Sequence, residues 1–424
     1  MILLKRLSNG IPVVLEEIEY LRSVSLGVYV KAGSAYENEK NNGISHLLEH
    51  MLFKSTKNRT SKQIADEMAH IGGNLNAFTE KESTSFYVTA LEEQLKPCIE
   101  LIGDMICNPL FLEEELEKEK GVVLEEIDMY EDSPEDLVHE MLQKLAWEKH
   151  ALGYIISGDK EMVKKITREE LIAYKEITYT ADRMVISIAG KVKIEETMQW
   201  LEENFASLPN TEKHLELTAP VYKPIVFCRT KDMEQVHLNL AFETVSYESA
   251  EKYVLYILNS ILGGGDNARL FQKLREEEGL TYSIYSYESL YEKGGLFHID
   301  AVLNPSKLQT AFQQIEQTIH LMCEEGITEK ELEQAKQQLK TDLIIGNEST
   351  KSKIYNHGKT YLMRGTLRTL DEILEDIYRV TCQDVQSFAR KYLQWEKKCV
   401  SVVGNIAEDK LFFLKKGEDV SCHE

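Results

Sequence analysis

Two histidines four residues apart, with a glutamate directly before the second, constrain this chain more than any other feature. His46, Glu49 and His50 lie in the run 45–53, which contains no glycine or proline. Residues four apart share one face of a helix, so both imidazoles can hold the same metal ion. Glu49 could then reach a water on that ion, as in a zinc hydrolase. The spacing therefore predicts a helix that carries a catalytic zinc site.

The order H-x-x-E-H is the inverse of the more familiar zinc-peptidase order H-E-x-x-H. Asn-Asn-Gly at 41–43 precedes the run and is predicted to form a turn and an N-cap for the helix. A histidine pair at this spacing also arises by accident on surface and core helices. A third ligand is needed to decide between the two interpretations.

The stretch 111–130 offers many candidates for that ligand, because it is rich in glutamate. Glu119 and Glu126 are two helical turns apart and would face the same way on a helix that starts near Leu112. The alternative interpretation is a solvated acidic face without a ligand. Residue pattern alone does not separate these possibilities.

The run 42–54, Asn-Gly-Ile-Ser-His-Leu-Leu-Glu-His-Met-Leu-Phe-Lys, resembles the pitrilysin or insulinase family of inverted zinc peptidases. It is most similar to the branch of the catalytic subunit of mitochondrial processing peptidase, here in a bacterial form. In that family the third ligand is a glutamate about 76 positions after the second histidine, which is Glu126 here. The resemblance implies one zinc ion per chain on His46, His50 and Glu126, and places Glu119 beside the site.

The resemblance also implies an activity, a zinc endopeptidase that cleaves peptides or unfolded polypeptides with Glu49 as general base. The segment 72–79 is similar to the family strand to which substrate adds as a further strand, which makes Asn76 and Ala77 candidate substrate-binding residues. Its alternation into 84–88 predicts a β-hairpin without reference to any family.

In the second half of the chain, Arg275 and Tyr282 resemble a family pair that holds the scissile peptide. Three glycines, Gly263, Gly264 and Gly265, match a glycine-rich loop that handles substrate in processing peptidases. No phosphate-loop lysine follows them, so we expect neither nucleotide binding nor a nucleic-acid partner.

The two halves of the chain look like copies of one another. The strand-like run 24–30 corresponds to 236–242, and each leads into an apolar helix, but the second helix, at 253–262, has no histidine pair. We predict an α+β fold of two homologous α/β sandwich halves, each a mainly antiparallel sheet packed with helices, like the processing-peptidase and LuxS metalloenzymes. The predicted domains are 1–208, with the zinc site, a linker at 209–223, and 224–424, without metal and positioning substrate.

Composition describes ordinary globular material, with 43% hydrophobic and 28% charged residues among 424. No stretch is long and apolar enough to span a membrane, and no signal or transit sequence is recognisable. Seven cysteines without a C-x-x-C pair indicate reduced thiols and a cytoplasmic location.

Since the family completes its site with a second pair of domains, the resemblance implies a dimer, either of identical chains or with a related chain. Two other classes stay open: a non-catalytic partner subunit of the same family, and a binding scaffold.

Overall fold

The computed structural model describes residues 2–210, 215–406 and 420–423. These residues form two compact units, each assembled from separated segments of the chain. The first unit comprises Met1–Asp128, Tyr154–Glu216 and Ile345–Leu367, and the second comprises Met129–Gly153, Leu217–Ile344 and Arg368–Glu424.

The first unit is built on a six-stranded sheet with the order β1-β2-β6-β3-β5-β4. Its strands are β1 Ile2–Arg6, β2 Pro12–Glu17, β3 Ser23–Val30, β4 Asn76–Thr79, β5 Thr84–Leu91 and β6 Met184–Gly190. Only β2 and β6 pair in parallel, and the other neighbours are antiparallel. The β4–β5 pair confirms the predicted hairpin, and it leaves β4 at the end of the sheet.

The second unit repeats this plan with the order β12-β7-β11-β8-β10-β9. Its strands are β7 Val226–Thr230, β8 Val236–Thr244, β9 Thr281–Leu290, β10 Gly295–Leu303, β11 Cys399–Gly404 and β12 Val420–His423. Strands β7 to β11 occupy the places that β2 to β6 hold in the first sheet. The prediction of two related, mostly antiparallel α/β halves is confirmed, including the correspondence of 24–30 with 236–242.

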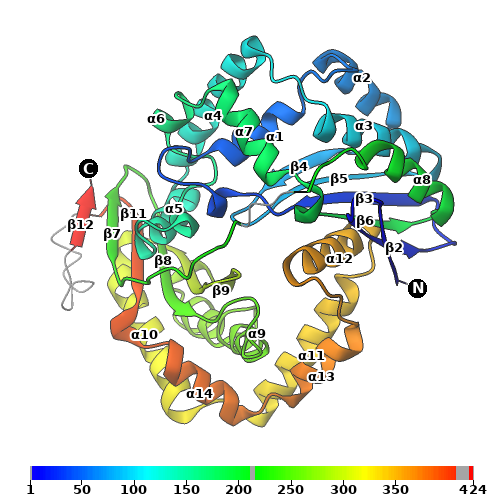
Figure 1. The fold of residues 1–424 in the computed structure, drawn as a ribbon. Helices are drawn as coiled ribbons and strands as arrows, with labels where there is room; N and C mark the ends of the chain where they lie inside the picture. Colours follow the sequence, from blue (N-terminus) through cyan, green and yellow to red (C-terminus); the bar gives the residue numbers. More distant parts are fainter. Residues whose placement is uncertain (1, 211–214, 407–419, 424) are drawn as a thin grey trace. The chain divides into compact units, whose positions relative to one another are not determined.

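Helices cover both faces of the first sheet. They are α1 Ile44–Leu52, α2 Ser61–Ile71, α3 Leu95–Cys107, α4 Glu113–Asp132, α6 Lys160–Val163, α7 Arg168–Thr178, α8 Ile194–Phe205 and α12 Thr350–Arg364. Figure 1 shows α1 and α3 above β4 and β5, with α12 on the other side of β3 and β6. The main core of this unit lies on the α1 side, where buried strand residues meet buried residues of α1, α3 and α8.

The second sheet is covered in the same way by α9 Lys252–Leu262 and α14 Cys382–Tyr392 on one side and α5 Pro134–Ala146 on the other. Helices α10 Leu308–Glu325, α11 Glu329–Ile345 and α13 Leu370–Arg379 complete the unit. Its core joins β8 and β10 to α9, α10 and α14. None of the helices in the described ranges has the length and apolar composition of a membrane span.

Two helices cross between the halves of the sequence. Helix α5, encoded before residue 209, packs on β8 and β11 of the second unit, while α12, encoded after residue 223, packs on β3 and β6 of the first. The compact units therefore differ from the predicted segments 1–208, 209–223 and 224–424. Local sequence patterns identify each helix but carry no information about which sheet it covers.

Candidate metal centre

Helix α1 begins where a buried carboxylate meets its first backbone N–H groups. Glu37 accepts hydrogen bonds from the backbone nitrogens of Gly43 and Ser45, each at 2.8 Å, and from the side chain of Asn42, also at 2.8 Å. Burial raises the pKa of Glu37, and these donors oppose that rise. Within the predicted capping turn 41–43 the N-cap is Gly43, with φ 98°, and Asn42 supports Glu37.

The apolar side chains of α1 anchor it in the core, which fixes the direction of its polar face. Ile44, Leu47, Leu48, Met51 and Leu52 are at most 1% exposed. His46 and His50 lie on the remaining face, with side chains 12% and 21% exposed and ring centroids 4.7 Å apart. The predicted pairing of the two imidazoles on one helical face is therefore observed.

Helix α4 brings the glutamates to this face. Glu126 Oε1 lies 3.8 Å from His46 Nε2, and Glu126 Oε2 lies 3.6 Å from His50 Nε2. Ligand atoms of these three side chains all lie within 4.8 Å of one another. Atoms bound to one zinc ion at about 2.0–2.2 Å would be separated by such distances, so this set of two imidazoles and a carboxylate fits zinc. Among the described residues no other group of this kind meets the same geometric condition.

Glu119 lies beside the three candidate ligands and contacts His50. Its Oε2 lies 3.3 Å from His50 Nδ1, and its Oε1 lies 2.6 Å from Lys54 Nζ. A carboxylate at Nδ1 favours the tautomer with hydrogen on Nδ1, which leaves Nε2 free to bind a metal. Lys54 lies two residues after the end of α1 and had been given no role in the sequence interpretation, although it belongs to the run 42–54 that resembles the family.

Burial and neighbouring charges give the two histidines different pKa values. Burial, together with the nearby His50, lowers the pKa of His46 to about 4, so His46 is neutral at neutral pH. Burial also disfavours the charged form of His50, but hydrogen bonds to Glu126 and Glu119 outweigh it and raise the pKa. His46 is thus the neutral imidazole of the site. His50 binds a proton more readily, and that proton would compete with a metal ion.

Glu49 points from α1 toward strand β4. It is 9% exposed, and the hydroxyl of Thr79 donates a hydrogen bond of 2.5 Å to its Oε2. Burial raises the pKa of Glu49, while the Thr79 bond lowers it. Thr79 was quoted within the substrate strand but given no role. Strand alternation places it on the same face as Ala77, which is a signal that could have identified it.

The candidate substrate residues divide between the two units. Asn76 and Ala77 lie on β4 in the same unit as the metal cluster, at the edge where no described strand pairs. Arg275 belongs to the second unit, with its guanidinium 4.7 Å from the ring centre of Phe271. Tyr282 is the second residue of β9 and is 66% exposed. Within a single unit, the structure does not unite Arg275 and Tyr282 with the histidine cluster.

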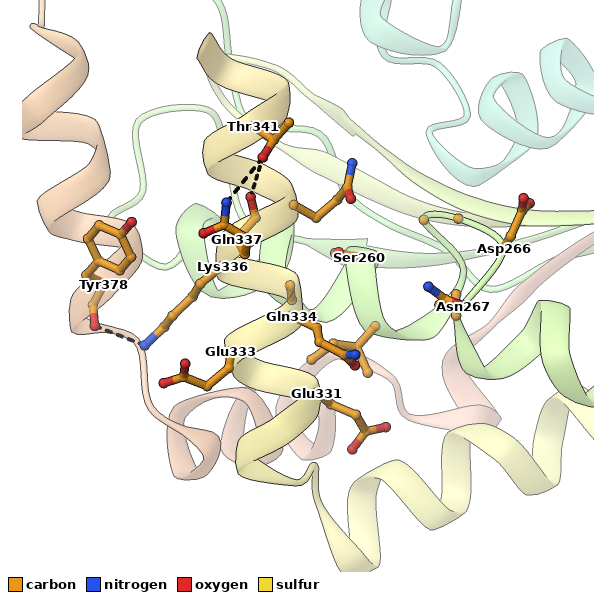
Figure 2. Close-up of a pocket in the computed structure, with 16 residues that line it drawn as sticks. Ser260, Asp266, Asn267, Glu331, Glu333, Gln334, Lys336, Gln337, Thr341 and Tyr378 are labelled. Carbon is orange, nitrogen blue, oxygen red and sulfur yellow. Dashed lines mark hydrogen bonds between the residues drawn. The ribbon is translucent and has the colours of Figure 1, made fainter. Parts of the chain in front are cut away.

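The glycine-rich loop lines a polar groove in the second unit. Gly264 and Gly265 are among the residues that line a cavity of about 870 Å³, to which α11 also contributes. Figure 2 labels Asp266 and Asn267, which follow the glycines, and several lining residues of α11. Gly263 itself is buried against Ser286, where a Cβ atom would clash. The side chains that line this groove are mainly amides, hydroxyls and carboxylates, among them Asn267, Gln334 and Glu333.

Comparison with known proteins agrees with this geometry. Residues 12–160 match the family described as Insulinase (Peptidase family M16), and residues 165–339 match the Peptidase M16 inactive domain. The zinc protease YmxG of Bacillus subtilis, itself uncharacterized, is 40% identical over 90% of this chain and 93% of its own length. An uncharacterized zinc protease of Mycobacterium leprae is 34% identical over 95% of this chain and 92% of its own.

Solved structures share the fold. A peptidase M16 inactive domain from Pseudomonas fluorescens superposes with a TM-score of 0.89 at 21% identity, covering 96% of this chain and 98% of that one. A protease from Helicobacter pylori gives 0.87 at 22% identity, covering 95% and 99%. The family resemblance inferred from the sequence is confirmed, and the chain belongs to peptidase family M16, the insulinase family.

Proposed function

We propose that this chain is a zinc-dependent endopeptidase in which Glu49 is the general base. The observation that carries the proposal is the convergence of His46, His50 and Glu126 on one point, with the carboxylate of Glu49 on the same helix. Relatives named as zinc proteases support the choice of metal and reaction. A scaffold or a non-catalytic partner subunit would have no need of all four groups together.

When bound, a zinc ion would polarise the peptide carbonyl and lower the pKa of a water to about 7. Glu49 then accepts a proton from the attacking water and delivers it to the leaving amine. Its elevated pKa suits the first step, because the conjugate base of a weaker carboxylic acid is the better proton acceptor. The Thr79 hydroxyl fixes one carboxylate oxygen, which leaves the other free to exchange the proton.

Glu119 acts as a positioning residue in this proposal. It holds His50 through Nδ1 and is itself held by Lys54, so the imidazole presents Nε2 in one orientation. Loss of such a partner in metal sites typically costs about 10- to 100-fold in affinity or activity.

Peptides or unfolded polypeptides are the proposed substrates, because an extended chain can pair with the open edge of β4 through its backbone. In this scheme Asn76 and Ala77 contact the added strand. Arg275 and Tyr282 would supply donors to the scissile carbonyl, and residues 263–265 would guide the chain. We place these second-unit groups on another subunit, which makes the working enzyme a dimer, and we expect it in the cytoplasm.

Metal analysis and peptide hydrolysis test the central proposal together. The purified chain should contain about one zinc ion and cleave internally quenched peptides, and a chelator should abolish cleavage until zinc is restored. Zinc without cleavage would indicate a non-catalytic partner subunit, and absence of both would indicate a scaffold.

A complementation experiment tests the shared site. Chains with His46→Ala and chains with Arg275→Ala should each be inactive, but a mixture should regain activity, since some dimers then pair an intact zinc half with an intact Arg275 half. Absence of rescue after verified subunit exchange would contradict the dimeric site.

A further inference from the structure

The first sheet has two faces with different side chains. One faces the metal centre, and the other faces away from it. Residues paired across strands share a face, so the register places Tyr29, Ser85 and Phe78 on one side. Thr79, Thr84 and Val30 lie on the other side, toward α1 and Glu49. Side chains at successive β4 positions therefore point alternately toward the metal centre and away from it.

The face away from the metal centre contains an aromatic pocket. Its volume is about 350 Å³, and it is formed by β3, β4, β5 and the segment 346–356 around the start of α12. The ring centre of Phe78 lies 5.9 Å from that of Tyr87 and 6.0 Å from that of Tyr355, while Tyr29 and Tyr355 are 6.2 Å apart. Such separations are those of packed aromatic pairs, so the walls support one another.

Hydrogen bonds hold the polar ends of two wall tyrosines. The hydroxyl of Tyr355 donates to Glu80 Oε1 at 3.3 Å, and the hydroxyl of Tyr87 accepts from Lys351 Nζ at 3.4 Å. The Lys351 ammonium also lies 4.5 Å from the ring centre of Tyr87. With these groups engaged, the ring carbons form the lining, and Ile354 adds a further apolar wall.

Helix α12 approaches the sheet closely at this point. Gly358 lies against the ring of Tyr29, where an added Cβ would clash. A larger residue would displace the ring that forms the floor of the pocket. The pocket thus depends on a helix encoded almost 300 positions after β4, a distance that no local pattern reveals.

We infer that this aromatic pocket is a specificity site, which accepts one apolar or aromatic side chain of the peptide strand bound at the edge of β4. The inference rests on the proposed function. A strand added beside β4 must alternate its side chains in phase with the sheet. Residues opposite Ala77 and Thr79 then face the metal centre, and a residue opposite Phe78 faces the pocket. The volume lies at the lower end of the range for ligand pockets and suits one large side chain.

Two consequences follow for substrates. Counted from the scissile bond, an apolar residue should be favoured at either an odd or an even position of the substrate, and not at the positions immediately next to it. Each methylene gained or lost in an apolar pocket changes selectivity by about 10- to 200-fold. Phenylalanine in place of alanine at the pocket position should therefore raise kcat/KM at least about tenfold.

The test scans phenylalanine through each position of an alanine-based quenched peptide. The wild-type ratio of kcat/KM for phenylalanine over alanine should peak at a position of one parity, and Tyr355→Ala should reduce that peak about tenfold or more. Tyr355→Phe keeps the ring and should retain the peak. Tyr20→Ala, at a tyrosine 86% exposed in the same unit, is the matched control and should also retain it.

A second variant fills the pocket without removing a wall. Asn356 is an exposed residue of the lining, and Asn356→Phe should suppress the same peak. A peak that survives both Tyr355→Ala and Asn356→Phe, or equal preference at adjacent positions, would overturn the assignment.

Binding separates failure of the pocket from failure of the proposed function. Fluorescence anisotropy of labelled peptides on a zinc-loaded Glu49→Gln chain measures affinity without cleavage. The phenylalanine peptide should bind about tenfold more tightly than the alanine peptide, and Tyr355→Ala should remove the difference. If binding shows this preference but the wild type cleaves no peptide, only the proposed activity is contradicted. Without the preference, the pocket assignment is wrong even if cleavage is observed.

Discussion

The two sheets have the same strand order, yet among the described residues only the first unit carries a cluster of candidate metal ligands. Helix α1 follows β3 and presents His46, Glu49 and His50, whereas α9 follows β8 in the corresponding place and is mainly apolar. Both helices bury one face in a core, and both preserve the fold. The duplicated fold therefore determines where each helix lies. The three side chains on α1 distinguish it from α9 as a candidate metal-binding helix.

Helices α5 and α12, which cross between the halves of the sequence, allow a second comparison of the two units. In the first unit, Lys353 of α12 lies 2.7 Å from Glu16. In the second unit, His139 of α5 lies 3.2 Å from Asp300, which also accepts a hydrogen bond of 2.8 Å from Asn239. Each helix thus meets its sheet through a partly buried polar pair. The second pair resembles a catalytic arrangement in residue type, but its contacts are those of helix docking.

His50→Ala should have the largest effect, because it removes a ligand from the cluster on α1 and α4, and the described part of the second unit has no equivalent. Zinc measured by mass spectrometry should fall from about one ion per chain to near zero, and peptide cleavage should be lost. His70→Ala, at an exposed histidine on α2, should keep both. If His50→Ala retained about one zinc ion per chain, the metal would be bound at another site, and the contrast between the two units would be wrong.

Glu49→Gln should distinguish the role of the general base from that of the metal ligands on the same helix. The variant should retain about one zinc ion while kcat falls by about 10²- to 10⁴-fold, because no group remains to transfer the proton. Glu125→Gln, at an exposed residue next to a proposed ligand, is the matched control and should keep its kcat. Wild-type turnover by the Glu49→Gln chain would show that another base acts.

Asp300→Asn tests whether the polar pair of the second unit is structural. Burial raises the pKa of Asp300 to about 7, so the folded state holds a proton that the unfolded state releases near pH 4. The contribution of this group to stability is thus complete below about pH 4 and is lost as pH rises through 7, by up to about 1.4 kcal/mol per pH unit.

Denaturant unfolding at several pH values measures this effect. The difference in unfolding free energy between wild type and Asp300→Asn should shift in favour of the variant between pH 4 and 7. His139 titrates in the opposite sense, since burial lowers its pKa to about 4, but it is present in both proteins. Cleavage should change little. A loss of activity comparable to that of Glu49→Gln would show that this polar pair also takes part in catalysis.

Ionic strength should have the smallest effect. The net charge is −22, and a solvated acidic exterior explains it without any function. If acidic groups also surround the bound peptide, kcat/KM for a Lys/Arg-rich peptide should fall severalfold between about 0.01 and 0.15 M salt, where the screening length drops from about 30 to 8 Å. A neutral peptide of equal length should change little. Equal salt responses would leave the charge a property of the exterior alone.

Features with a local signature were predictable from the sequence. A run without glycine or proline identified α1, apolar composition identified α9, and strand alternation identified the β4–β5 hairpin. The spacing of His46 and His50 determined that the two imidazoles share a helical face. The choice of Glu126 among many glutamates required the family resemblance, because every acidic residue on α4 follows the same local rules.

Other features depend on contacts between distant parts of the chain. Glu37 caps α1 because folding buries its carboxylate beside the first backbone N–H groups, and Thr79 meets Glu49 because β4 passes α1. The crossing of α5 and α12 arises from packing that no helical period encodes. By itself, then, the sequence determined which residues form the catalytic helix and that the fold is duplicated. Only the tertiary structure decided how Glu49 is held and what lies behind β4, since both depend on burial between segments far apart in the chain.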